Sequence, residues 1–444
     1  MDFCDSYRSY FCVARHNVSS KAQCYLAGLL MKAPRKNMER MEEYVEQYDY
    51  QAQQQFLSDS PWDHEELIAR IGQDVDTVVG GEETALLIDE SGFEKKGEKS
   101  VGVARQWNGR LGKVDNCQVG VFAALSDGRH GSLVDVRLYL PESWAKDTQR
   151  CKAAKIPPEQ CRYRTKGELA LEMVDAAVAN GLNFGWVGFD GGYGNVPWLL
   201  REVAERGLRF VADVHRDQTI YPADPCPYLP RRKQGAGRKF TRLRARTEGV
   251  QIKAFFEGIP ENCWRRIAIR DTTKGKLHVQ GCRRRVWVWD GKEKQARCWW
   301  AVCIRNPATG ETKWFLSNAS EKVTLTTLVR QHAVRFWIER MFQDAKTSVG
   351  MADYQARGWR AWHHHMALVM LALLFMLRER KLHSQEIEML SCQDIVELLD
   401  FYLPRADTTE EAILRNMERR HQKRRQSIES AKRKKFRKVG QSLS

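Results

Sequence analysis

The sequence predicts an α/β protein in which a mixed sheet flanked by helices is interrupted by a mostly β insertion domain, with helical regions at both ends. The spacing of apolar residues is helical over the first 80 residues and then changes to short runs of Val, Leu and Ile. From there strands and helices follow in the order βββαβαβ. Runs of alternating residues between positions 218 and 312 predict the insertion.

The helical N-terminal region is expected over residues 1–80, where segments 20–33, 37–48 and 60–71 carry helical spacing. Four strands are predicted at 84–91, 117–125, 132–140 and 183–190, and a fifth at 208–214. Helices are predicted at 166–181, which ends at a glycine, and at 196–207. These elements form the first part of a core that spans residues 81–217.

Size and composition indicate a folded protein that stays in the cytoplasm. The chain has 444 residues, of which 43% are hydrophobic and 10% aromatic, enough for two or three domains. Its longest apolar run, residues 366–377, has twelve residues. A membrane-spanning helix needs roughly twenty, so we expect a buried helix and no membrane partner. The N-terminus has no secretory signal, and the twelve cysteines form no C-x-x-C pair.

Positive charge is concentrated in two segments. The chain has 72 Lys and Arg against 56 Asp and Glu, a net charge of +16. Residues 231–246 carry +8 and residues 415–438 carry +10, so the rest of the chain holds −2. Neither segment lies beside a strong apolar stripe, which favours nucleic acid over a membrane surface as the partner. For the terminal segment alone, a solvated helix or disordered tail remains an alternative.

Two acidic residues end strands that the element order brings together. The order resembles the RNase H-like nuclease core, in which the first and fourth strands are neighbours. Asp89 ends the first strand and Asp190 ends the fourth, so their carboxylates would meet at one edge of the sheet. Glu339 is the candidate for a third acid, 149 residues after Asp190, in a helix over 335–355. Each aspartate alone could equally belong to a strand-end turn; the coincidence of all three in this order favours a site.

Three such carboxylates suit phosphodiester chemistry. Two divalent ions about 4 Å apart can activate a water or hydroxyl, stabilise the leaving oxygen and offset phosphate charge. Hard cations such as Mg²⁺ take oxygen ligands. Without cations the carboxylates would raise one another's pKa. The sequence therefore predicts a metal-dependent nuclease centre.

The glutamate helix carries the pattern R-x-x-x-E-x-x-x-x-x-x-K at Arg335, Glu339 and Lys346. This resembles the helix of bacterial insertion-sequence DDE transposases, whose family pattern adds a tyrosine three residues before the arginine; His332 stands there in this chain. Segments around Asp89 and Asp190, the helical N-terminal region and the segment after the glutamate helix are also similar to the family, so the resemblance covers nearly the whole chain.

The resemblance implies roles for these residues. Asp89, Asp190 and Glu339 would be the catalytic residues and ligands of two Mg²⁺ ions, for which Mn²⁺ can substitute. Arg335 and Lys346 would contact DNA phosphates, with His332 beside them. Relatives in the hairpin-forming group also place a tryptophan in a strand before the glutamate helix to stack on a flipped base. Trp314, in segment 312–318, takes that position, with a core tryptophan as the alternative.

The long interval before Glu339 agrees with a β insertion domain at 218–312, as members of this group have. The first basic segment lies inside it, and its cations at the start of the segment are expected to contact DNA: Arg231, Arg232, Lys233, Arg238 and Lys239. The core would resume over 313–380 with the glutamate helix. Residues 381–444 are expected to form a helical C-terminal region with a basic tail.

The expected function is cut-and-paste DNA transposition of an insertion sequence, through a hairpin intermediate. The expected partners are double-stranded DNA, as terminal inverted repeats and target, and a second copy of the chain in a synaptic complex. The protein would act in the bacterial cytoplasm at the nucleoid. Two alternatives remain: a transposase-derived nuclease that cuts without integrating, and a non-catalytic DNA-binding protein that keeps the fold.

Overall fold

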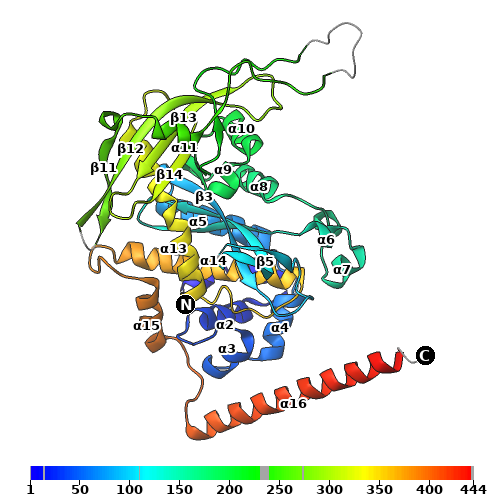
Figure 1. Ribbon diagram of the computed structural model, residues 1–444. Coiled ribbons are helices and arrows are strands. Elements are labelled where there is room, and N and C mark those ends of the chain that lie inside the picture. Colours follow the sequence, from blue (N-terminus) through cyan, green and yellow to red (C-terminus); the bar gives the residue numbers. More distant parts are fainter. Residues whose placement is uncertain (1, 14–15, 110, 231–239, 273–274, 442–444) are drawn as a thin grey trace.

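The computed structural model describes residues 2–13, 16–109, 111–230, 240–272 and 275–441 (Figure 1). Its main feature is one ten-stranded sheet in the order β11-β12-β13-β14-β8-β7-β3-β5-β4, with β6 also paired to β5. These strands are β3 (Gly81–Glu94), β4 (Ala104–Asn108), β5 (Lys113–Ser126), β6 (Gly131–Leu138), β7 (Phe184–Phe189), β8 (Phe210–Val214), β11 (Arg265–Thr272), β12 (Gly275–Val288), β13 (Arg297–Arg305) and β14 (Thr312–Ser317). Two short pairs lie outside the sheet: β1 (Cys12–Val13) with β2 (His16–Asn17), and β9 (Thr219–Ile220) with β10 (Val250–Gln251).

The helices of the N-terminal region and the core are α1 (Asp2–Asp5), α2 (Ser19–Leu30), α3 (Met38–Tyr44), α4 (Tyr50–Ser58), α5 (His64–Val79), α6 (Glu142–Ala145), α7 (Thr148–Ala153), α8 (Lys166–Ala179), α9 (Gly191–Gly194) and α10 (Pro197–Glu205). Those of the second half are α11 (Ile252–Glu257), α12 (Leu325–Val334), α13 (Phe336–Ser348), α14 (Trp359–Leu382), α15 (Cys392–Tyr402) and α16 (Glu410–Gln441). Short 3₁₀ turns occupy η1 (Arg8–Phe11), η2 (Pro158–Gln160) and η3 (Glu261–Cys263).

The middle of the sheet has the RNase H-like arrangement that the element order predicts. Strand β3 pairs antiparallel with β5, and β5 pairs antiparallel with β6. On its other side β3 pairs parallel with β7, and β7 pairs parallel with β8. The five strands therefore lie in the order third, second, first, fourth, fifth. This arrangement confirms the predicted fold class of a mixed sheet flanked by helices.

The five core strands were all expected, and β4 was not. Segment 104–108 has one strongly apolar residue, Trp107, and its side chain is 53% exposed. The strand pairs only with the first residues of β5, so its backbone hydrogen bonds, and not an apolar face, hold it. Apolar periodicity gives no signal for such an edge strand.

The strands of the predicted insertion extend the same sheet. Strand β14 pairs antiparallel with β8, which joins β11, β12 and β13 to the core (Figure 1). In this register Phe315 lies opposite Asp213, and Trp314 lies opposite Val214. The insertion therefore adjoins the core strand that ends beside Asp190.

Two groups of helices pack on the sheet. Helices α5, α13 and α14 contact β5 and β6, while α8 and α10 pack against each other and against β5 and β8. Helix α14 also contacts α2 and α4, so it joins the N-terminal region to the core. In the described part of the chain, α14 is the one helix long and apolar enough to cross a membrane. Of its apolar window 89% is buried inside the protein, which is also the pattern of a core helix.

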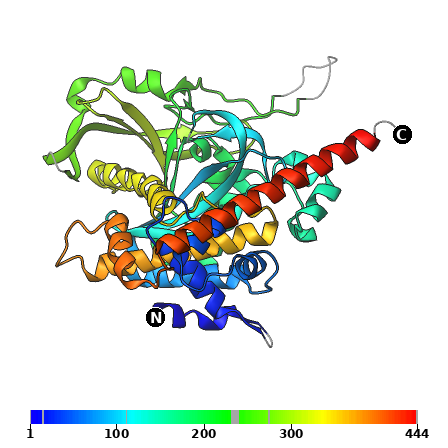
Figure 2. The same ribbon diagram turned by 90° about the horizontal axis from the view of Figure 1, so that it is seen from below.

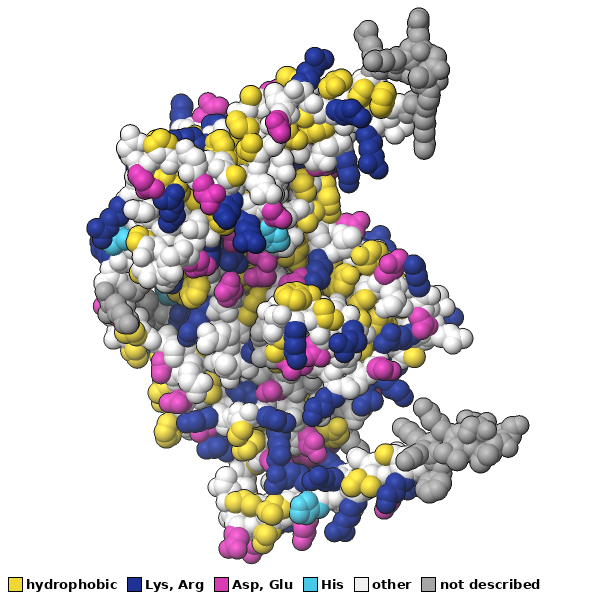
Figure 3. Space-filling model, viewed as in Figure 1, with side chains coloured by type: hydrophobic (Ala, Val, Ile, Leu, Met, Phe, Trp, Pro, Cys, Tyr) yellow, Lys and Arg dark blue, Asp and Glu magenta, His cyan; other side chains and the backbone are white. Residues whose placement is uncertain are grey.

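The C-terminal helix α16 extends away from the body as a long rod (Figures 1 and 2). Lys and Arg side chains gather along its described part (Figure 3). Its first half touches the N-terminal region through ion pairs from Arg419, Arg420 and Lys423 to Glu42 and Glu43 of α3.

Candidate active site

Strand β3 places Asp89 on the face of the sheet that α13 covers. Asp89 lies directly opposite Phe122 of β5, and opposed residues of an antiparallel pair point to the same face. The ring of Phe122 packs edge-on against Phe342 of α13 at 5.2 Å. The Asp89 carboxylate is therefore directed toward the helix that carries Glu339.

Strand β7 brings Asp190 to the same edge. Ile88 of β3 pairs with Phe189 of β7, and Asp190 directly follows Phe189 where the strand ends. There it is the N-cap of the short helix α9, and its carboxylate accepts a hydrogen bond from the backbone N–H of Tyr193 at 3.1 Å. Asp89 and Asp190 thus lie on neighbouring parallel strands, as predicted. The expectation that Asp89 ends its strand is wrong: the pairing with β7 ends at Ile88, but β3 continues to Glu94 because it stays paired with β5.

The two aspartates oppose each other's ionisation. Burial raises the pKa of Asp89, and the negative charge of Asp190 raises it further. Burial also raises the pKa of Asp190, although the backbone N–H of Tyr193 and the charge of Arg335 oppose the shift. Two ionised carboxylates in this position are unfavourable unless a cation lies close by.

Helix α13 brings Glu339 and Arg335 to this edge. Ile338, Phe342 and Ala345 on the same helix are buried in the core. Arg335 lies at the junction of α12 and α13, with only 17% of its side chain exposed. Its Nη1 is 3.2 Å from Glu339 Oε1 and 4.0 Å from Asp89 Oδ2. The guanidinium therefore connects the glutamate to the aspartates.

A fourth acid, Asp213 of β8, was not expected from the sequence. Its Oδ2 is 3.0 Å from Arg335 Nε, and its Oδ1 is hydrogen bonded to His332 Nε2. Burial raises the pKa of Asp213, but His332 and Arg335 outweigh it and hold this pKa below the usual range. His332 is itself buried and stacks on Phe315 with ring centroids 4.4 Å apart. In the sequence Asp213 is flanked by apolar residues in segment 210–214. That pattern predicts a strand but gives no sign that the acid belongs to the site.

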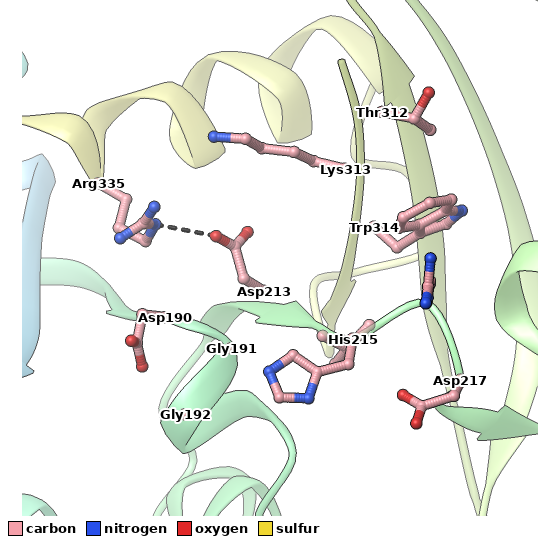
Figure 4. A pocket seen from close by; sticks show the side chains of 12 residues that line it. Asp190, Gly191, Gly192, Asp213, His215, Asp217, Thr312, Lys313, Trp314 and Arg335 are labelled. Atoms are coloured by element: carbon pink, nitrogen blue, oxygen red, sulfur yellow. Dashed lines mark ion pairs between the residues drawn. The ribbon is translucent and has the colours of Figure 1, made fainter. Parts of the chain in front are cut away.

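A hollow of about 640 Å³ opens beside these residues (Figure 4). Its lining comes from the ends of β7 and β8, from β14 and from Arg335, and it includes Asp190, Asp213, His215, Lys313 and Trp314. Figure 4 shows the ion pair between Asp213 and Arg335 at one side of the hollow and Trp314 at the other. The volume is enough for a nucleobase with its sugar, and the walls carry both cations and acids.

A family model described as DDE superfamily endonuclease matches residues 9–276, more than half of the chain. This chain is a DDE superfamily endonuclease. The matched region includes Asp89 and Asp190 and ends before Glu339, so the match itself does not reach the third acid. The expectation of an endonuclease is confirmed by this match.

The DDE endonuclease is also similar to curated and solved proteins. It is 25% identical over 358 residues to the probable transposase for insertion sequence element IS701 of Microchaete diplosiphon, which covers 80% of each chain. The predicted resemblance to insertion-sequence DDE transposases is therefore confirmed. A piggyBac transposase, solved as a synaptic complex with hairpin DNA, is 11% identical, with a TM-score of 0.41 over 94% of this chain and 80% of that one. A likeness at that level supports no further argument.

DDE nucleases use divalent metal ions, and the donor atoms here suit them. Asp89, Asp190 and Glu339 offer carboxylate oxygens, the ligands that hard cations prefer. Among the described residues, no group of three or more Asp, Glu, His or Cys side chains is arranged so that it could hold a metal ion. Glu339 is 53% exposed and is paired with Arg335 instead.

The other residues expected to contact DNA lie at different depths. Lys346, in the last turn of α13, has its ammonium within 6.0 Å of the rings of Phe93 and Phe342. Trp314 of β14 is half-buried, and its indole Nε1 has no hydrogen-bond partner among the described residues. His332 is buried against Asp213 and Phe315, not at the surface. Arg231, Arg232, Lys233, Arg238 and Lys239 lie outside the described residues.

Proposed function

We propose that this DDE endonuclease moves an insertion sequence by a cut-and-paste reaction at the ends of the element. The observation that carries the proposal is the meeting of Asp89 and Asp190 at one sheet edge, with Glu339 held to Asp89 through Arg335. Three acids from separate parts of the chain converge, which costs electrostatic free energy in the absence of cations. Such a cost is expected where the acids serve a cation-dependent reaction.

The reaction uses two kinds of chemical step, hydrolysis and transesterification. Water attacks the phosphodiester at the transposon end, and the bond between phosphorus and the 3′ oxygen breaks, which frees a 3′ hydroxyl. That hydroxyl then attacks the phosphorus of a second phosphodiester. A new phosphorus–oxygen bond forms, the bond from that phosphorus to its original 3′ oxygen breaks, and the displaced strand leaves with a 3′ hydroxyl, so this second step conserves the number of phosphodiester bonds. In this assignment Asp89, Asp190 and Glu339 would hold two Mg²⁺ ions, or Mn²⁺ in their place, which would stabilise the charge on the reacting phosphate. Arg335 and Lys346 hold phosphates of the DNA beside them.

A hairpin on the transposon end is part of the proposal. The freed 3′ hydroxyl first attacks the phosphodiester of the opposite strand, which closes the end, and a second attack by water then opens the hairpin and frees the 3′ hydroxyl for insertion. Joining the two strands of one end bends the DNA tightly and unstacks a base, at a cost of a few kcal/mol. Trp314 lines the hollow that Asp190 and Arg335 also line. Stacking a base on an indole recovers ~1–3 kcal/mol. The half-buried position of Trp314 is consistent with an indole face available to a base.

The proposed partners follow from the reaction. The enzyme binds double-stranded DNA at the terminal inverted repeats and at the target, with the basic segments of the insertion and of α16 contacting phosphates. Two ends must be held together, so two copies of the chain form the synaptic complex. The enzyme acts in the cytoplasm, where bacterial DNA lies.

Isosteric replacement of the three acids tests the assignment. Asp89→Asn, Asp190→Asn and Glu339→Gln each remove a charge and a metal ligand with little change of shape. We expect Mg²⁺-dependent nicking of end DNA to fall at least about 10²-fold, in keeping with the loss of a metal ligand, while DNA binding persists in a gel-shift assay. Asp135→Asn, a buried acid on β6 paired with Arg137, is the matched control and should keep activity.

Three outcomes separate the candidate functions. Substantial cutting by any one of the three variants would show that a wrong carboxylate is assigned. Cutting without joining by the unaltered enzyme would favour a nuclease that no longer integrates. Specific binding of end DNA without nicking in Mg²⁺ or Mn²⁺ would favour a non-catalytic DNA-binding protein.

A further inference from the structure

Asp213 is a carboxylate at this site that the proposed reaction does not use, and it is the one of the hollow's unused acids that is paired with Arg335. Its side chain is 14% exposed and lies on β8, the strand beside β7. Both of its oxygens are engaged, Oδ2 by Arg335 and Oδ1 by His332. Two partners restrict the rotation of the Asp213 carboxylate. A carboxylate restricted in this way can in turn fix the position of the Arg335 guanidinium.

His332 fixes this arrangement from behind. The imidazole is buried, stacks on Phe315 at an interplanar angle of 15° and contacts Asp213 through Nε2. Phe315 lies opposite Asp213 in the pairing of β14 with β8. The carboxylate of Asp213 is therefore fixed by the sheet and by α12, and its position does not depend on Glu339.

Different nitrogen atoms of the Arg335 guanidinium lie near different acids. Its Nε lies 3.0 Å from Asp213 Oδ2, an ion-pair distance, although this Nε makes no hydrogen bond to a described residue. Its Nη1 lies 3.2 Å from Glu339 Oε1 and 4.0 Å from Asp89 Oδ2. The positive charge of Arg335 thus offsets the mutual repulsion of the acids. A divalent cation bound by Asp89 and Glu339 would repel the guanidinium from them. Asp213 would then be the acid left to hold it.

We propose that Asp213 is a positioning residue which, fixed by His332, retains the guanidinium of Arg335 when divalent cations take Asp89 and Glu339 from it. The inference rests on the proposed function, since it assumes that those acids bind the cations. Asp213 holds Arg335 at the edge of the hollow, beside Lys313, where it can meet a DNA phosphate. Without Asp213 the guanidinium has Asp89 and Glu339 as its remaining acids and competes with the metal for them.

Mn²⁺ affinity of the whole protein without DNA tests this, measured by calorimetry or by the spin-resonance signal of free Mn²⁺. We expect Asp213→Asn to weaken Mn²⁺ binding by at least about fivefold, the lower end of coupling between interacting sites. Arg335→Gln removes the competing cation and should strengthen binding. In the Arg335→Gln background, Asp213→Asn should have little further effect. Asp135→Asn, which breaks a comparably buried Asp–Arg pair on β6, should leave Mn²⁺ affinity unchanged.

Each other outcome overturns the inference. An equal loss of affinity from Asp213→Asn in both backgrounds would make Asp213 a metal ligand. Unchanged affinity in both, with or without a lower melting temperature, would reduce it to a structural residue. If Asp213→Asn does not fold, His332→Gln is measured instead; it should weaken Mn²⁺ binding in the same direction, and unchanged affinity would count against the inference. Failure of the unaltered protein to bind Mn²⁺, or binding that survives Asp89→Asn, would contradict the proposed function instead.

Discussion

At the scale of residues, Arg335 explains why a helix packed on the core also carries a glutamate flanked by cations. Ile338, Phe342 and Ala345 bury one side of α13, and Arg335 is drawn into the same interface by acids of the sheet. Burial alone would lower the pKa of this guanidinium, but Asp213 and Asp89 raise it above its usual value. The positive charge of Arg335 therefore offsets the negative charges of the acids at this site, which explains why the side chain is buried.

Trp314 can be tested as a stacking residue. Trp314→Ala removes the indole that lines the hollow beside Asp190, so a flipped base would lose ~1–3 kcal/mol of stacking. We expect first-strand nicking to be retained while hairpin formation falls roughly 5- to 150-fold, as that free energy implies. An abasic nucleotide at the flipped position should restore part of the hairpin yield. The two steps are measured by strand-specific end labelling.

Trp300 on the neighbouring strand β13 provides the control. It is 9% exposed in the core, so Trp300→Ala should lower the melting temperature and impair both steps together, at a cost of about 3–5 kcal/mol. If Trp314→Ala behaves like Trp300→Ala and an abasic end brings no recovery, Trp314 is a core residue and its assignment to DNA is wrong.

The three proposed catalytic acids could be predicted from the sequence, whereas the role of Asp213 could not. Asp89 and Asp190 stand at the ends of apolar runs, and Glu339 falls in a spaced pattern with Arg335. Asp213 lies in a strand that is buried on both faces, where alternation does not reveal which side an acid faces. Its partner His332 is 119 residues away. The two meet because α12 packs on β8 and His332 stacks on Phe315 of β14.

At the scale of elements, helix α14 is buried along nearly its whole length despite three consecutive histidines. His364 stacks on Trp62 with ring centroids 3.7 Å apart and shares a hydrogen bond with its carbonyl oxygen. His365 Nδ1 is hydrogen bonded to the Tyr25 hydroxyl at 2.8 Å. All three histidine side chains are buried. They join the N-terminal helices to the core.

These histidines predict acid sensitivity. Burial lowers the pKa of His364 and of His365 to about 3. The unfolded chain, with a histidine pKa of about 6.5, binds more protons than the folded chain below that pH. The free energy of unfolding should therefore contain the full contribution of the neutral histidines above pH 6.5, and it should decrease as the pH falls from 6.5 toward 3. Each histidine contributes a slope of up to about 1.4 kcal/mol per pH unit, measurable from urea unfolding at pH 7.5 and 5.5.

Glutamine replacement separates this effect from simple loss of packing. His364→Gln and His365→Gln should each destabilise the protein at pH 7.5 and also reduce the difference in stability between pH 7.5 and 5.5, because glutamine does not titrate. His16→Gln, at an exposed position, should change neither. An undiminished pH dependence in both core variants would show that other groups cause the acid sensitivity.

The sequence predicted most elements by their periodicity but not the extent of α14. Its twelve-residue apolar run was recognised, whereas the helix has 24 residues. The histidines and the tryptophans before the run count as polar or amphipathic in a periodicity argument. Their burial depends on partners such as Trp62 and Tyr25, which lie about 300 residues earlier in the chain.

At the scale of the whole molecule, the strands of the predicted insertion and those of the core belong to one sheet. The sequence indicated a β insertion from its alternating runs, but the pairing of β14 with β8 links residues about 100 positions apart. Long-range pairing leaves no local signature. Its consequence is that Trp314 and Lys313 share the hollow with Asp190 and Asp213.

Helix α16 presents two faces with different surroundings. Ala412, Asn416, Arg420 and Lys423 recur at spacings of three and four and are the less exposed residues of its described part. On this side Arg419 joins Arg420 and Lys423 in ion pairs with Glu42 and Glu43 of α3. Arg424, Arg425 and Lys432 are exposed and have no ion pair with any described residue. The two sets of three cations therefore form a matched pair for experiment.

Neutralising each set to glutamine changes the net charge equally, so any difference reports position. If the outward set of Arg424, Arg425 and Lys432 holds phosphates, its removal should weaken binding to end DNA and to unrelated DNA alike. The log–log salt slope should fall by about 0.9 for each phosphate that the protein no longer neutralises.

Removal of the inward set, Arg419, Arg420 and Lys423, should speed hydrogen exchange in α16 and change the slope less, because those charges already face α3. The slopes come from fluorescence anisotropy between 50 and 200 mM salt, a range over which salt strongly weakens binding that depends on phosphates. An unchanged slope for the outward set would make α16 a solvated helix, and equal slopes for both sets would show that total charge matters and the orientation of α16 does not.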